Sequence, residues 1–206
     1  QRQQNRWLLA GLKAKLAAAT MQLDGVLGAS PRYLATNLAF TVDGASLTEF
    51  SGLLSGIELP RSPFRAAGNV TVGNDDALHL SRAQVTVGDS TATLSLDLGL
   101  PFDASFLRFD VEATVPDPMK LFVGVGGAQS LGSNLHISAA GQRLGEQWSF
   151  DRLRIGSDIG LINVRGAITL LPEFSAQNAQ FEMNTPSLRR TGLASSHRWP
   201  DVALQL

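Results

Sequence analysis

The chain has 206 residues, of which 44% are apolar and 17% are charged, and its formal net charge is -1. This length and apolar content can form a substantial core, although the charged fraction is below the roughly 25% of an ordinary soluble domain. The charges are scattered rather than grouped, so the chain lacks the basic field that attracts nucleic acid. It has no cysteine, and no apolar run approaches the roughly 20 residues that a helix needs to span a bilayer.

The first segment, residues 7–28, allows two interpretations. The run from Trp7 to Leu23 is rich in Ala, Leu and Lys and by propensity predicts an amphipathic helix. Comparison with two later segments favours a β-hairpin, because apolar residues recur at matching positions. The matching triplets are Trp7, Leu9 and Leu12, then Leu78, Leu80 and Ala83, then Trp148, Phe150 and Leu153.

A short strand and a helix signal follow this segment. Residues 38–42 alternate between apolar and polar side chains, as a half-buried strand does. Ser46 and Glu49 then form a capping box, in which Ser46 would accept a hydrogen bond from the amide of Glu49. The apolar stripe of residues 50–57 predicts a short helix directly after it.

The middle of the chain shows the clearest alternation. From Thr91 to Leu100 the leucines at positions 94, 96, 98 and 100 occupy one phase, with Thr93, Ser95 and Asp97 on the other. Residues 107–115 and 162–170 repeat this pattern, which predicts amphipathic antiparallel strands with one apolar face.

Two further helix signals stand after later strands. Asp117-Pro118 supplies an N-cap followed by proline at the first helical position, and Thr185-Pro186 repeats the device ahead of Leu188. The Arg189-Arg190 pair beyond it is typical of a solvated helix end.

These segments recur about 71 residues apart, and we therefore interpret the chain as a single repeat array over residues 1–206. The predicted units are approximately 1–72, 73–140 and 141–206, each with several antiparallel strands and one short helix. The first residues carry neither an initiating Met nor a signal-peptide pattern, so we expect a fragment of a longer protein.

An apolar face of this extent must be covered or occupied. A soluble monomer rarely exposes an apolar patch larger than a few hundred Å². Three outcomes are open: two sheets packed as a sandwich, a closed barrel, or a curved sheet whose groove holds an apolar ligand. Repetition favours the open form, because an array can keep adding strands.

The order of these segments resembles the AsmA-like family of Gram-negative envelope proteins, which is related to TamB and to the chorein-type bridge lipid-transfer proteins. The resemblance rests on alternating strands that end in Leu-Pro, the Leu107-Arg108-Phe109-Asp110-Val111 strand, and the Gly56-Ile57-Glu58-Leu59-Pro60 loop after a helix. Residues 198–206 resemble the segment that often opens the C-terminal module of the family. Residues 124–132 depart from it, since they replace the Leu-Pro loop after the second helix.

The resemblance implies a curved, groove-like sheet in the periplasmic part of an inner-membrane-anchored protein. Its expected function is to conduct phospholipid between the inner and outer membranes, with acyl chains in the groove, the membrane bound through other parts of the protein, and envelope proteins as partners at the ends. No cofactor or metal is expected. The residues predicted to line the groove are Leu94, Leu96, Leu98, Phe109, Val111, Ile137, Phe150, Val164 and Ile168. Plain core packing under a second sheet is the alternative for each of them.

Enzymatic function is not supported by the sequence. His79, His136 and His197 lie far apart, and the first two occupy the polar phase of strands, where solvated surface histidines are common. No nucleophile elbow, carboxylate pair or dinucleotide loop is recognisable, and Gly124 to Gly127 predicts a turn. The alternative to a lipid conduit is a structural or protein-binding β-repeat module.

Overall fold

The computed structural model describes most of the chain. The described residues are 2–3, 6–16, 18–30, 32–48, 60–75, 77–99, 103–121, 132–145, 147–169, 175–186 and 204–205. The predicted helix over residues 50–57, the turn at Gly124 to Gly127, and the segments containing Leu188, Arg189, Arg190 and His197 lie outside them.

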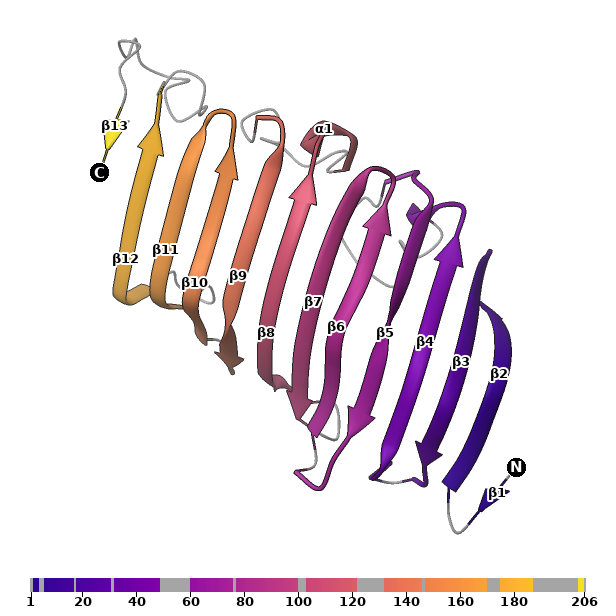
Figure 1. Ribbon diagram of the computed structural model, residues 1–206. Coiled ribbons are helices and arrows are strands. Elements are labelled where there is room, and N and C mark those ends of the chain that lie inside the picture. The colour runs from indigo at the N-terminus through magenta and orange to yellow at the C-terminus, as the bar shows by residue number, and fades with distance from the viewer. Residues whose placement is uncertain are drawn as a thin grey trace.

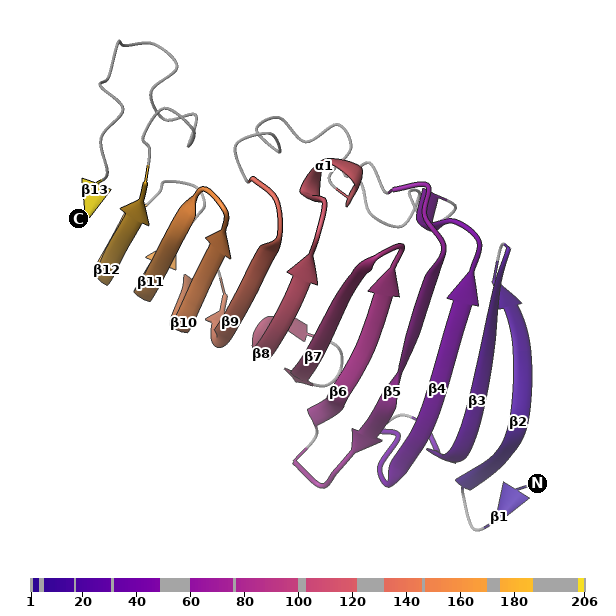
Figure 2. The ribbon, with the colours of Figure 1, turned by 45° about the horizontal axis from the view of Figure 1, so that its top comes forward.

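The described strands form one antiparallel sheet in which each strand pairs with its neighbours in the sequence (Figure 1). β1 and β13 are only two residues long and lie at opposite ends of the sheet (Figure 2). This is the meander that the sequence predicts. The strands are β1 (Arg2–Gln3), β2 (Arg6–Leu16), β3 (Ala19–Gly28), β4 (Thr36–Gly44), β5 (Phe64–Val72), β6 (Ala77–Val87), β7 (Ser90–Gly99), β8 (Asp103–Val115), β9 (Leu135–Leu144), β10 (Gln147–Ser157), β11 (Gly160–Thr169), β12 (Ser175–Thr185) and β13 (Leu204–Gln205).

Residues 7–23 form the predicted hairpin and not a helix. β2 pairs with β3, and Trp7, Leu9 and Leu12 stand opposite residues 27, 25 and 23. A bulge between Leu9 and Leu12 preserves the phase of the apolar residues, and Gly11 sits within it with a φ of +61°. The Gly11 amide donates to Asp24 Oδ1 at 2.5 Å. Backbone pairing of β2 with β3, and of β3 with β4, therefore overrides the helix propensity of this segment.

One of the three predicted helices lies in the described part of the chain. α1 (Pro118–Leu121) begins at the predicted proline, and Asp117 caps it by accepting from the Lys120 amide at 3.4 Å. At the third signal the Thr185 hydroxyl donates to the Ile159 carbonyl at 2.7 Å, and the helix expected after it falls on undescribed residues. At the first, Ser46 Oγ accepts from the Thr48 amide at 3.3 Å; Glu49 is not described.

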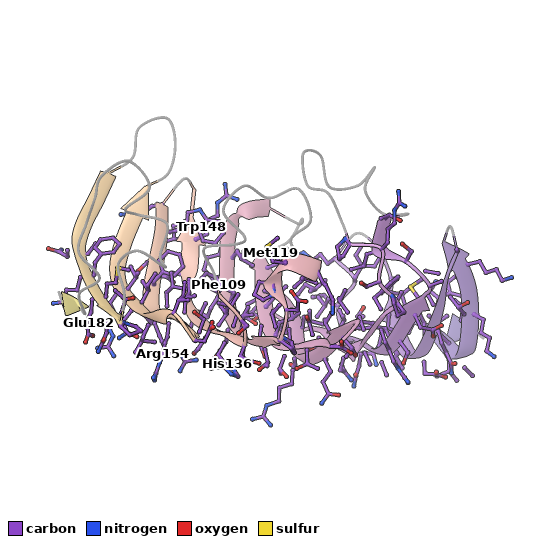
Figure 3. All side chains as sticks on the ribbon, turned by 90° about the horizontal axis from the view of Figure 1, so that it is seen from above. Phe109, Met119, His136, Trp148, Arg154 and Glu182 are labelled. Carbon is purple, nitrogen blue, oxygen red and sulfur yellow. The ribbon has the colours of Figure 1, made fainter. Side chains whose placement is uncertain are left out.

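The described strands make a single layer, which is neither a sandwich nor a closed barrel. Extensive contacts between described elements join only neighbouring strands. The accessible surface of the chain is 13314 Å². A compact monomer of this mass would expose only about 9,300 Å². Viewed along its layer, the sheet is modestly curved, with Phe109 and Trp148 on the concave side and His136, Arg154 and Glu182 on the convex side (Figure 3).

Candidate apolar binding face

The strand register brings the predicted leucines, Phe109 and Val111 onto one face of the sheet. Leu96 of β7 stands opposite Phe109 of β8, and Leu94 stands opposite Val111. Residues that are paired across antiparallel strands point to the same side, as do residues two apart within a strand. Leu98 therefore shares this side, and so does Ile137, which stands opposite residue 113 in β8. We call this side of strands β2–β12 the apolar face.

The three remaining predicted residues occupy the same register positions farther along. Phe150 stands opposite Gly141, and Val164, only 6% exposed, stands opposite Leu153. The backbone of Ile168 pairs with that of Trp148, but the structure does not describe the Ile168 side chain. None of the nine positions falls on the other face.

The apolar face is wider than the nine predicted positions. It continues through β2–β6 and β12, and it also takes in further residues of β10 and β11. Four of these additional residues are exposed: Trp7 at 48%, Leu12 at 46%, Ile162 at 38% and Phe181 at 57%. The register adds Trp7, Leu9, Leu12, Met21, Leu23, Leu38, Phe40, Val42, Val70, Leu78, Leu80, Val85, Leu153, Ile155, Ile162, Phe181 and Met183.

Three aromatic rings gather on this face over β8–β10. The centroids of Phe109 and Trp148 are 5.8 Å apart, those of Phe109 and Phe150 are 6.0 Å apart, and both pairs meet edge to face. Trp148 and Phe150 stack at 6.4 Å. Gly141 of β9 stands between Phe109 and Phe150, so the rings of β8 and β10 meet across a position without a side chain. Each such pair is worth about 0.5–1.5 kcal/mol beyond its buried area.

The opposite face is polar and charged. Arg152 Nη2 lies 3.0 Å from Glu112 Oε1 and 3.4 Å from Asp110 Oδ1, and Ser138 donates to Glu112 at 2.8 Å. A hollow of about 1140 Å³ on this side is lined by Glu112, Ser138 and Arg152 together with His136 and Arg154. Acyl chains would have to desolvate these charged groups to enter the hollow, which opposes binding there.

His79 also lies on the polar face, as expected, but it is not simply solvated. Its Nδ1 is 2.8 Å from Asp97 Oδ1 and its Nε2 is 2.9 Å from Asp75 Oδ2. The hydrogen bond to Asp97 raises the pKa of His79 above its ordinary value of 6.5; partial burial opposes this rise and the Asp75 carboxylate adds to it. The two carboxylates lie on opposite sides of the ring, and no cluster able to hold a metal ion occurs among the described residues.

We expect this contact to make folding stability depend on pH. Because the folded-state pKa of His79 is raised, its contribution is fully present below about pH 6.5 and is lost as the pH rises through the folded-state value. The free energy of unfolding of the wild type, measured with urea, should therefore be lower at pH 8 than at pH 6. His79→Gln should show a smaller fall. An equal decrease in the free energy of unfolding in both proteins would show that His79 is not the source of the pH dependence.

The fold and this face define an open, single-layer antiparallel sheet that is apolar on one side. Comparison of the chain with protein-family models, with curated proteins and with solved structures gave no match. Among the described residues, no helix has both the length and the hydropathy required to cross a bilayer.

Proposed function

We propose that the chain is a segment of an envelope protein of the AsmA-like kind, whose apolar face binds phospholipid acyl chains and conducts lipid between the inner and outer membranes. The observation that carries this proposal is the continuity of the apolar face from β2 to β12 within a single layer of described strands. The groove would be the concave side of the sheet, where Phe109 and Trp148 lie (Figure 3).

Conduction would depend on the burial of acyl chains against the apolar face and would need no covalent step. Removing an acyl chain from water is worth about 0.8 kcal/mol per methylene group. Neighbouring strands offer similar side chains, such as Leu80, Leu96 and Phe109 in one row. An acyl chain that moves across the sheet therefore exchanges one apolar contact for another. Such a surface needs no catalytic group and no cofactor.

The proposal includes an array of three units of about 71 residues with one short helix each. Three equivalent bulges support it: β2 shifts register between Leu9 and Leu12, β6 between Leu80 and Ala83, and β10 between Phe150 and Leu153. In the first two, the bulge amides have equivalent partners, because Gly11 donates to Asp24 and the amide of residue 82 donates to Ser95 Oγ at 3.1 Å.

Loop contacts and side-chain pairings recur in the same way. The Gly88 amide donates to the Pro63 carbonyl at 2.9 Å, and the Asp158 amide donates to the Ser133 carbonyl at 3.3 Å. Phe40 faces Gly68 just as Phe109 faces Gly141. We place the boundary between the second and third units in the turn after Leu144 and not at residue 140, because β9 continues to Leu144.

The surroundings of the protein follow from the same proposal. The chain would lie in the periplasm as part of an inner-membrane-anchored protein, would reach the membrane through other parts of that protein, and would meet further envelope proteins at the ends of the array.

Expression of the chain in a Gram-negative periplasm, followed by purification without detergent, tests the function. Native mass spectrometry and lipid extraction should find phospholipid in a defined ratio to protein. A folded protein without lipid would exclude the conduit and leave the structural or protein-binding module.

A further inference from the structure

Arg143 is a cation on the apolar face. It stands opposite Leu107 in β8 and Trp148 in β10, two residues that belong to this face. Among the side chains described in strands β2–β12, it is the single charged group that the register places there. It lies near the end of β9, beside the turn to β10, at the opposite end of the strands from α1 (Figure 1).

Among the described residues, the guanidinium of Arg143 has only neutral partners. Its Nε donates to the Gly145 carbonyl at 2.7 Å, and its Cζ lies 5.5 Å from the centroid of the Trp148 ring. Neither partner is an anion, and no described carboxylate pairs with this group, whereas Arg152 on the polar face is paired with two. The Nε contact fixes the plane of the guanidinium, and no described residue accepts from its two terminal nitrogens, which can act as donors.

This arrangement suits one class of ligand, an acyl amphiphile with a negatively charged head. Phe109, Trp148 and Phe150 provide a rigid aromatic surface for the chain, and the adjacent guanidinium can bind two phosphate oxygens in parallel. Because Arg143 lies at a strand end, the charged head of the lipid can stay hydrated at the rim of the sheet while its acyl chain lies over the aromatic rings.

We propose that Arg143 and Trp148 form a headgroup site for the phosphate of a phospholipid with a net negative charge. A zwitterionic lipid would bring an ammonium group to a rim where no described anion on the apolar face can receive it. The site therefore selects lipid by charge, while the rest of the face accepts any acyl chain. This inference rests on the proposed function.

The test uses the whole chain and vesicles of equal parts phosphatidylglycerol and phosphatidylcholine. After incubation the protein is separated from the vesicles, and the bound lipids are quantified by class. The wild type should hold phosphatidylglycerol in about fivefold excess, as expected for one partly exposed charged contact. Arg143→Gln should bind the same total amount of lipid without this excess, and Arg143→Lys should retain part of it.

The matched control is Arg154→Gln, which removes a cation from the polar face beside the hollow and should leave the excess unchanged. Total lipid reports on the proposed function, and the ratio of the two lipids reports on Arg143. A wild type that binds no lipid overturns both proposals. Lipid bound without selection, or a selection that persists in Arg143→Gln or disappears in Arg154→Gln, overturns the headgroup site alone.

Discussion

Replacing Leu96 by aspartate should lower the phospholipid that co-purifies with the chain by about tenfold or more. Leu96 lies in the middle of β7, between Leu80 of β6 and Phe109 of β8, so a charge there interrupts the apolar face. An acyl chain crossing this row would have to desolvate the carboxylate, at a cost of several kcal/mol. Val111→Asp, one strand away, should have the same effect. Lipid per protein is measured by extraction and mass spectrometry.

The control for this result is Thr86→Asp. Thr86 is exposed on the polar face of β6, beside Arg65 and Thr91, so the new charge remains in water. Circular dichroism and urea midpoints establish that all three variants keep the fold. The lipid-conduit proposal fails if folded Leu96→Asp and Val111→Asp proteins retain the lipid content of Thr86→Asp.

The second large effect concerns stability and is expected from Gly141→Ala. A Cβ at Gly141 would press against the Ser149 carbonyl oxygen and lie 3.1 Å from the Phe150 Cα, both of them backbone atoms. Because backbone cannot swing aside as a side chain can, β9 and β10 would have to separate under the aromatic cluster. We expect a loss of about 3 kcal/mol, the upper part of the range for overpacked sites. Urea unfolding measures it.

Gly99→Ala is the matched control in β7. Among the described residues, a Cβ there would meet only the Phe106 side chain at 3.9 Å, which is an ordinary contact. Because alanine restricts the unfolded chain more than glycine, this change should be neutral or slightly stabilising. Equal urea midpoints for the Gly141 and Gly99 variants would show that the close approach of β9 to β10 is not as tight as the structure indicates.

Much of the sheet was predictable because strands carry their own signature. Leu94, Leu96 and Leu98 alternate with polar residues, and the structure places them on the face that was expected. In the first hairpin local propensity and internal comparison disagreed, and the comparison was right. The internal comparison succeeded because apolar residues recur at matching positions where strands pair in the same way. The helix propensity of the Ala-rich run, by contrast, is only a fraction of a kcal/mol per residue.

The candidate site was predicted in outline and missed in detail. The alternation of apolar and polar residues predicted the middle of the apolar face. It did not predict Arg143, because a polar residue at a strand end is equally typical of the start of a turn. Nor could it find the contacts of His79, whose partners Asp75 and Asp97 come from a turn and from the next strand. The cluster of Phe109, Trp148 and Phe150 likewise depends on Gly141 of the strand between them.

The sequence by itself determined that this protein is a chain of amphipathic strands with one apolar and one polar side, since side chains alternate along any extended backbone. Only the tertiary structure decided that the strands form one open and modestly curved layer, where the bulges fall, and which side chains meet across it. The reason is physical. Periodicity along one strand defines its faces, whereas closure, curvature and cross-strand neighbours depend on the register between strands, and a bulge of one residue changes that register with little trace in the local pattern.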